Sequence, residues 1–271
     1  MSEPLRLLAC LAHPDDESLG MGGTFLRYGD EGVETYLLTA TFGDKGRYKG
    51  VREGPNYPGR EGLGKIREQE LYGAAKKLGV REVIGLGYRD GEFDQVPHAE
   101  AVGRIAAAIR RLRPQVVVTF AGDGSYGHPD HIAISQFTTA ATVVAAMPSA
   151  DVAGAPHTVS KLYWLAWPQS SMTAYSDSAQ LPHPVVDGVE RHPVAWPEWQ
   201  ITTRIATPGL YPRIWEAVRC HDSQSASWQG LDRITAENRE VIWGCDCWYR
   251  VYSLVNGGRT PETDLFEGLR G

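Results

Sequence analysis

Short apolar runs rich in branched residues alternate along this chain with longer stretches of helical period. This alternation is typical of parallel strands joined by helices, and it constrains the fold more than any other feature of the sequence. The strands are expected at residues 5–11, 35–41, 83–86, 115–120 and 161–167. The helices are expected at residues 17–32, 65–78, 99–112, 131–146 and 213–220. The pattern predicts an α/β fold with a Rossmann-like, mostly parallel doubly wound sheet.

The pattern weakens after the fifth predicted strand. Residues 168–200 are rich in Pro, Ser, His and Trp, which favours a loop-rich C-terminal extension that starts at about residue 168. Residues 45–64 are expected to form an irregular loop. A length of 271 residues is within the range of one α/β domain that carries insertions. We therefore expect a single domain over residues 1–271.

The balance of charge argues against nucleic acid as a partner. The formal net charge is −6 and the pI is about 5.8, whereas phosphate backbones are bound by concentrated Lys and Arg. The longest early apolar stretch, residues 5–12, is too short to span a membrane, and it runs into a His-Pro-Asp-Asp-Glu sequence unlike a signal-peptide cleavage region. We expect a cytoplasmic protein without a membrane partner, and the sequence is compatible with a homo-oligomer.

The four cysteines do not form a recognisable framework. They are Cys10, Cys220, Cys245 and Cys247. Their spacing is not that of a set of disulfides, and a lone Cys-x-Cys is a weak metal signal. We interpret all four as free thiols without a catalytic role.

Two clusters that contain histidine each follow a predicted strand. His13 and Asp16 come after the first strand, and His128 and His131 come after the fourth. Sites in open parallel sheets form beyond the carboxyl ends of the strands, so the two clusters are expected to meet. Within each cluster, a spacing of three residues in a turn that enters a helix lets both side chains face one cation. The sequence therefore predicts a metal site.

Two histidines and one carboxylate leave coordination positions open for water, whose pKa a divalent metal lowers toward neutrality. A neighbouring carboxylate, Asp15, could take the proton, and the second imidazole could stabilise an oxyanion and protonate a leaving nitrogen. Spacing alone does not separate Asp15 from Asp16. The same kind of donor set also suits ferrous iron.

Helix capping and dinucleotide binding are two alternative interpretations of the first cluster. An Asp-Asp-Glu sequence at a helix start is ordinary capping chemistry, but neither capping nor packing requires paired histidines and carboxylates at two places. The glycine-rich residues 20–23 suggest a dinucleotide-binding turn. Their spacing is wrong for it, and the acidic residues 15–17 would repel a pyrophosphate at that helix start.

The sequence resembles the PIG-L/LmbE-like family of deacetylases, which includes the bacillithiol- and mycothiol-type N-acetylglucosaminyl deacetylases. The resemblance is carried by residues 12–17, Ala-His-Pro-Asp-Asp-Glu, together with residues 128–131, His-Pro-Asp-His. It continues in order through residues 41–44, 67–70, 87–90 and 221–224. The last of these segments is kept out of the predicted site, because a histidine at a helix end is more often structural. Family members are zinc-dependent N-deacetylases of N-acetylglucosamine conjugates.

The resemblance implies the same hydrolase activity, a Zn²⁺ cofactor and a small amino-sugar conjugate as substrate. Carried over by motif, it implies that His13, Asp16 and His131 are the metal ligands. It also implies that Asp15 is the general base.

Further residues receive roles from the same resemblance. It implies that His128 is the acid or oxyanion stabiliser and that Asp130 orients His128. Tyr126 matches a tyrosine that some members use near the substrate carbonyl. Arg67 and Asp90 fall where the family places contacts with the sugar and its aglycone, as a charged pair at the rim of a pocket.

The sequence departs from many relatives at Lys45 and Arg47, where an acidic residue often follows the Gly-Asp step. Basic charge there would favour an acidic aglycone. Our hypothesis is that a carboxylate-bearing conjugate such as glucosaminyl-malate is a better substrate than a neutral one.

Two other classes of function stay open at this point. A ferrous 2-His-1-carboxylate oxygenase uses similar ligands, but it would depend on oxygen and usually has a β-rich scaffold. A non-catalytic sugar-binding module on the same scaffold would bind no metal.

Overall fold

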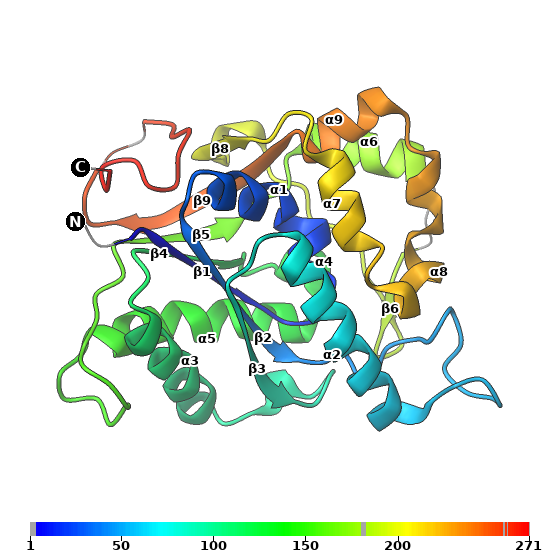
Figure 1. Cartoon of the computed structure of the whole chain (residues 1–271), viewed down its shortest axis with the longest axis horizontal. Coiled ribbons are helices and arrows are strands. Elements are labelled where there is room, and N and C mark those ends of the chain that lie inside the picture. Colours follow the sequence, from blue (N-terminus) through cyan, green and yellow to red (C-terminus); the bar gives the residue numbers. More distant parts are fainter. Residues whose placement is uncertain (1–3, 180–182, 257, 259, 271) are drawn as a thin grey trace.

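The computed structural model describes residues 4–179, 183–256, 258 and 260–270. The strands span Arg6–Leu11 (β1), Glu34–Thr41 (β2), Glu82–Tyr88 (β3), Val116–Phe120 (β4), Lys161–Leu165 (β5), Val185–Val186 (β6), Val189–Glu190 (β7), Thr203–Ala206 (β8) and Cys245–Ser253 (β9). Seven of them form one sheet in the order β3-β2-β1-β4-β5-β9-β8 (Figure 1). β1 to β5 are parallel, and β9 and β8 extend the sheet in antiparallel pairing. β6 and β7 form a separate hairpin.

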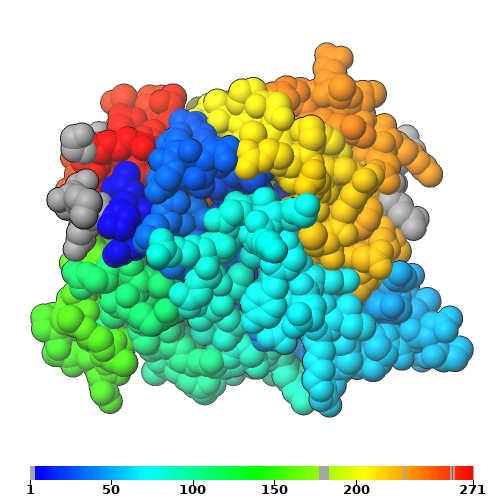
Figure 2. Space-filling view, viewed as in Figure 1, coloured from blue at the N-terminus to red at the C-terminus, as the bar shows by residue number. Residues whose placement is uncertain are grey.

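Helices cover both faces of the sheet. The α-helices span Asp16–Asp30 (α1), Gly59–Lys77 (α2), His98–Leu112 (α3), Gly124–Gly127 (α4), Pro129–Ala146 (α5), Gln169–Ala179 (α6), Tyr211–Val218 (α7), Ser225–Trp228 (α8) and Ala236–Trp243 (α9). Short 3₁₀ helices span Phe93–Gln95, Glu198–Gln200, Asp222–Gln224 and Gln229–Arg233. α3 and α5 pack together on one face, and α1, α2 and α7 pack together on the other (Figure 1). Figure 2 shows the blue, cyan and yellow segments of this second layer in contact.

The centre of the sheet is buried on both sides. Leu7 and Leu8 in β1, and Val117 and Val118 in β4, have no exposed surface. Strands covered by helices on both faces need continuous apolar runs and not an alternation of apolar and polar residues. This explains why these two segments are apolar almost throughout. Within the described part of the chain, no helix is long and apolar enough to cross a membrane.

The expected fold class is confirmed. The differences concern the start of α2 and the elements of the C-terminal extension. α2 begins at Gly59, inside the segment that was expected to be loop. In the predicted loop-rich extension the sequence analysis missed α6, β8, α9 and β9. β9 carries Asp246 among apolar residues, and an antiparallel strand near a sheet edge needs no long apolar run. The extension therefore completes the sheet in addition to packing on it.

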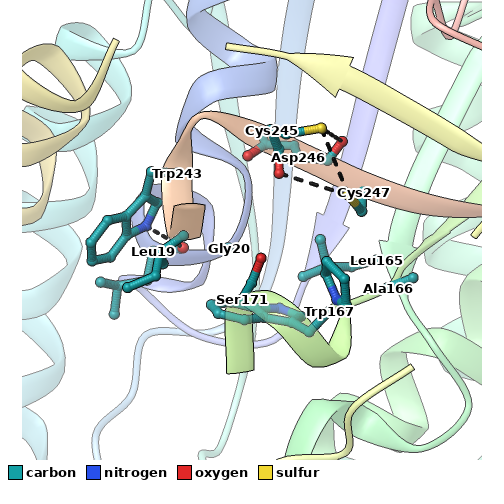
Figure 3. A pocket seen from close by; sticks show the side chains of 12 residues that line it. Leu19, Gly20, Leu165, Ala166, Trp167, Ser171, Trp243, Cys245, Asp246 and Cys247 are labelled. Atoms are coloured by element: carbon teal, nitrogen blue, oxygen red, sulfur yellow. Dashed lines mark hydrogen bonds between the residues drawn. The ribbon is translucent and has the colours of Figure 1, made fainter. Parts of the chain in front are cut away.

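All four cysteines are free thiols, as expected. The sulfurs of Cys245 and Cys247 lie 3.8 Å apart at a small pocket between α1 and β9 (Figure 3). At the same pocket Trp243 Nε1 donates a hydrogen bond of 3.2 Å to the carbonyl oxygen of Leu19. The pocket thus marks a contact of α1 with the end of α9 and the start of β9.

A buried carboxylate strengthens this contact. Asp246 Oδ2 accepts hydrogen bonds from the backbone N–H of Thr24 at 2.6 Å and from Thr24 Oγ1 at 2.7 Å. Burial raises the pKa of Asp246 to about 6, although the two Thr24 donors oppose the shift. Asp246 therefore ties α1, which begins in the first motif, to β9.

Asp246→Asn should change how stability depends on pH. A carboxyl group whose pKa is higher in the folded state contributes stability below its unfolded pKa, and this contribution is lost as the pH rises through the folded pKa. With a pKa raised from 3.8 to about 6, the wild type should lose up to roughly 3 kcal/mol relative to Asp246→Asn between about pH 4 and about pH 7. Urea unfolding of both proteins at both pH values measures this difference, and parallel pH profiles would contradict the assignment.

Candidate metal centre and active site

The two predicted motifs meet at the carboxyl ends of β1 and β4, which pair directly. α1 leaves β1 toward one face of the sheet, and α5 follows β4 on the other face (Figure 1). Ligand crevices of open parallel sheets form where the chain diverges in this way. His13 lies two residues after β1, and His128 is the N-cap of α5.

The proposed metal ligands converge. His13 Nδ1 lies 3.1 Å from His131 Nε2. Asp16 Oδ1 lies 3.5 Å from His131 Nε2, and Asp16 Oδ2 lies 3.8 Å from His13 Nδ1. Ligand atoms of a tetrahedral zinc site with bonds of about 2.0–2.1 Å stand roughly 3.3 Å apart. The three side chains are therefore close enough to share one small divalent cation, although Asp16 approaches the two histidines through different oxygens.

Neighbouring groups enlarge the set of donors. His13, His128 and His131 offer nitrogen atoms that all lie within 4.8 Å of one another, and His13, Asp90 and Asp130 offer atoms within the same distance. All five side chains are buried. The cluster suits a divalent cation chemically, and the distances alone allow more than one set of ligands.

The structure distinguishes Asp15 from Asp16, which spacing could not do. The side chain of Asp16 is 9% exposed, and its Oδ2 accepts the backbone N–H groups of Ala12 and His13 at 3.2 and 2.8 Å. The side chain of Asp15 is 26% exposed, and its Oδ2 lies 3.2 Å from Arg67 Nη2. Asp16 thus faces the histidines, whereas Asp15 keeps access to solvent.

The backbone at Asp15 explains this divergence. Asp15 is the N-cap of α1 and has a φ of 98°, in the left-handed region. Asp and Asn tolerate this region better than most residues that have a side chain. The Asp15 N–H donates to Glu17 Oε2 at 3.0 Å, which helps to hold the turn.

Arg67 is buried inside the site and not at its rim. Its guanidinium donates to the carbonyl oxygens of Gly43 at 3.0 Å and Pro14 at 2.5 Å, in addition to Asp15. Gly43 has a φ of 65°, and a Cβ there would lie 2.0 Å from Arg67 Nη1. The glycine is thus required for Arg67 to reach the first motif, and Arg67 fixes the position of that motif.

Asp90 and Asp130 both face His13. Their oxygens lie 3.3 and 3.2 Å from His13 Nε2. Asp130 Oδ2 also accepts the backbone N–H of Gly91 at 2.7 Å. We expected the Asp130 carboxylate to orient His128, and its partner in the structure is His13 instead. Asp90, expected at the rim, is likewise buried against the predicted metal ligand.

His128 and Tyr126 complete the site. His128 Nδ1 accepts the backbone N–H of Asp130 at 3.1 Å, so the proton of the neutral imidazole lies on Nε2. The ring of Tyr126 lies 5.8 Å from that of His128 and 5.1 Å from that of His131, measured between centroids. Both residues therefore lie beside the imidazole of His131.

The electrostatics of the cluster favour a cation. Burial alone would lower the pKa of His13, but the surrounding carboxylates raise it well above its usual value. Burial, reinforced by the two neighbouring imidazoles, lowers the pKa of His128 to about 3. Burial raises the pKa of Asp15 to about 6 in spite of the Arg67 guanidinium. The site thus concentrates negative charge around His13 and keeps His128 neutral.

A buried pair next to the first motif was not predicted from the sequence. Glu17 Oε1 lies 2.7 Å from His221 Nε2, and neither side chain is exposed. The charge of each side chain and the hydrogen bond between them lower the pKa of Glu17 and raise the pKa of His221. Burial acts in the opposite direction on each pKa. The one signal in the sequence was the matching segment at residues 221–224, which we had set aside.

Comparison with known proteins identifies the family. Residues 8–142 match the family described as PIG-L, GlcNAc-PI de-N-acetylase, and this stretch contains both motifs. The chain is 34% identical, over 296 aligned positions, to the 1D-myo-inositol 2-acetamido-2-deoxy-alpha-D-glucopyranoside deacetylase of Streptomyces avermitilis, with 97% of each chain covered. The chain belongs to the PIG-L family. The resemblance stated from the motifs is confirmed.

Solved structures share the fold of this PIG-L protein. The N,N'-diacetylchitobiose deacetylase of Pyrococcus horikoshii has a TM-score of 0.66 at 19% identity, covering 91% of this chain and 83% of that one. The 4-carboxy-2-hydroxymuconate hydratase GalB of Pseudomonas putida has a TM-score of 0.69 at 16% identity, covering 94% and 99%. A deacetylase and a hydratase thus share one fold, so the chemistry of this PIG-L protein has to be argued from its site.

His221→Ala should lower the free energy of unfolding by roughly 3–5 kcal/mol, because it leaves the Glu17 carboxylate buried without its partner. The double variant Glu17→Gln/His221→Ala removes that charge and should recover part of the loss. Urea unfolding measures both changes. His98→Ala, at an exposed position, is the matched control and should change stability by less than about 1 kcal/mol. An equally small loss in His221→Ala would show that the pair is not important for stability.

Proposed function

We propose that this PIG-L protein is a zinc-dependent hydrolase that removes the acetyl group from the nitrogen of an N-acetylglucosamine conjugate. The convergence of His13, Asp16 and His131 beside a more exposed carboxylate, Asp15, is the observation that carries the proposal. The name of the Streptomyces avermitilis relative supports the substrate class.

His13, Asp16 and His131 would hold the ion. Two imidazoles and one carboxylate are a ligand set that catalytic zinc sites use, with positions left for water or substrate. When bound, the ion would lower the pKa of a water molecule and polarise the acetyl carbonyl. Ferrous iron accepts the same ligands, so the identity of the ion is part of the proposal.

Asp15 would act as the general base. It is more exposed than Asp16, and burial raises its pKa to about 6, closer to the operating pH than that of an ordinary carboxyl group. Arg67 holds its Oδ2 at 3.2 Å and so fixes its direction. A carboxylate in this position can take a proton from an attacking water.

His128 would stabilise the oxyanion with a hydrogen bond, and the proton that Asp15 takes from the water would pass to the departing nitrogen. The backbone N–H of Asp130 occupies Nδ1, which leaves Nε2–H as the donor. A pKa of about 3 keeps the imidazole neutral, so it can donate this hydrogen bond without carrying a charge. Tyr126, with its ring beside His128, would contribute a second donor near the acetyl carbonyl.

Asp130, Asp90 and Arg67 would act as positioning residues. The two carboxylates hold the Nε2 edge of His13, so that Nδ1 points at His131. Arg67 joins the loop at Gly43 to the first motif. We assign direct sugar contacts to none of the three, because Arg67 and Asp90 are buried among protein groups.

The alternative of a ferrous oxygenase uses the same three ligands. The family relatives are named as deacetylases, and a carboxylate placed as a base has no role in activation of oxygen. Dependence of turnover on oxygen would favour this alternative over hydrolysis.

The first test is release of primary amine from N-acetylglucosamine conjugates by zinc-loaded protein. Asp15→Asn should retain zinc and lose at least about 100-fold in kcat, because it removes the base. Asn is preferred to Ala here because it tolerates the left-handed backbone of Asp15. His13→Ala should lose zinc itself, as measured by bound metal per chain.

The opposite pattern, in which Asp15→Asn loses metal and His13→Ala keeps it, would reverse the two roles. Amine release that is unchanged in both variants would refute the assignment of the site. Metal content and far-UV circular dichroism on each variant separate loss of the ion from loss of the fold.

The contacts of Lys45 give evidence on the charge of the preferred aglycone. Lys45 Nζ lies 2.8 Å from Asp187 on the turn between β6 and β7. One of the two basic side chains on which we based a preference for an acidic aglycone, Lys45, therefore already has a partner. We therefore propose a neutral inositol conjugate, as named for the relative, as the preferred substrate.

Comparison of kcat/KM for the inositol conjugate and for a carboxylate-bearing conjugate tests this preference. Wild-type protein should prefer the inositol conjugate, and Asp187→Asn, which frees the Lys45 charge, should shift the ratio of the two values toward the acidic conjugate. A wild-type preference for the acidic conjugate would restore our first hypothesis. Lys49→Ala, at an exposed lysine paired with Asp222, is the matched control.

A further inference from the structure

The hairpin of β6 and β7 carries a second group of metal-binding side chains, separate from the buried centre. Val185 pairs with Glu190, and Val186 pairs with Val189. The backbone N–H of Arg191 donates to the carbonyl oxygen of Pro184 at 2.9 Å, which continues the same register. His183 and His192 are therefore opposite each other, one pair beyond Pro184 and Arg191.

Side chains alternate between the two faces of a strand, so His183, Glu190 and His192 share one face of the hairpin. All three are exposed. The centroids of the two imidazole rings are 4.2 Å apart, and His192 Nε2 lies 3.4 Å from Glu190 Oε1. One donor atom from each residue lies within 4.8 Å of the other two.

We propose that His183, Glu190 and His192 form a second site for a borderline transition-metal ion such as Zn²⁺. Two imidazole nitrogens and one carboxylate suit this class of ion, whereas Ca²⁺ and Mg²⁺ require oxygen ligands. The remaining coordination positions are filled by water, because the site is open to solvent. An exposed Glu–His ion pair by itself contributes little to stability, so it does not account for a second histidine placed opposite the first.

The contacts of the hairpin with neighbouring segments determine what a bound ion would hold in place. The opposite face carries Arg191, whose Nη1 would lie 3.5 Å from a Cβ at Gly127. The turn contacts Lys45 through Asp187, and the N–H of Val194 donates to the carbonyl oxygen of Ser125 at 2.7 Å. The hairpin thus lies against α4, which carries Tyr126 and directly precedes His128. An ion bound across its two arms fixes them together over α4.

Titration of metal-free protein with Zn²⁺, with bound metal counted by equilibrium dialysis, tests the proposal. Wild-type protein should bind two ions per chain. His183→Ala and His192→Ala should each bind one, and His13→Ala should also bind one, now on the hairpin. His13→Ala/His192→Ala should bind none. His98→Ala removes an exposed histidine elsewhere and should keep both ions.

Binding of two ions by both hairpin variants, or of a single ion by the wild type that His192→Ala keeps and His13→Ala loses, would overturn the site. Hydrogen exchange of residues 183–192 supplies a second readout that does not depend on catalysis. Zn²⁺ should slow this exchange at least about tenfold in the wild type and not in His192→Ala. Unchanged exchange in wild-type protein with two ions bound would overturn the clamping of the hairpin. Because neither readout uses substrate, failure of the deacetylase assignment leaves this test intact.

Discussion

The direct pairing of β1 with β4 is the constraint on which the site depends. The register runs from Leu7 opposite Val116 to Cys10 opposite Thr119, and both strands are buried on both faces. A slip of one residue would exchange the side chains on the two buried faces and disrupt the packing of both, so close packing on each side fixes the register. Because the strands cannot shift, two histidines separated by 118 positions in the chain are held with their nitrogens 3.1 Å apart.

Two buried polar contacts with the C-terminal part of the chain hold α1 in place. Glu17 pairs with His221, and Thr24 bonds with Asp246, so both partners come from the C-terminal third of the chain. α1 carries Asp16 at its first position and Asp15 as its N-cap. The direction of these two carboxylates thus depends on residues that lie about 200 positions later in the chain.

The sequence was sufficient to predict the parallel core and the meeting of the two motifs at its switch point, because each motif comes soon after a strand with a strong apolar signal. It was not sufficient for Asp130, whose closeness to His128 in the chain suggested a side-chain contact. The backbone N–H of Gly91 draws that carboxylate toward His13 instead, and only the path of the loop after β3 determines this. Arg67 was misplaced at a rim for the same reason, because its burial depends on how the loop at Gly43 folds back.

The missed strand β9 shows a second limit. Its mixture of polar and apolar residues, including Asp246, is one that an antiparallel strand tolerates, and its buried polar group is explained only by Thr24, 222 positions earlier. This separation in the sequence also sets the order in which the parts of the domain can form during synthesis. Domains form from the N-terminus as synthesis proceeds, and the parallel core is available once β5 has emerged. The helix that bears the first motif acquires its anchor only when β9 follows, so a nascent chain can hold a nearly complete core before its catalytic end is fixed.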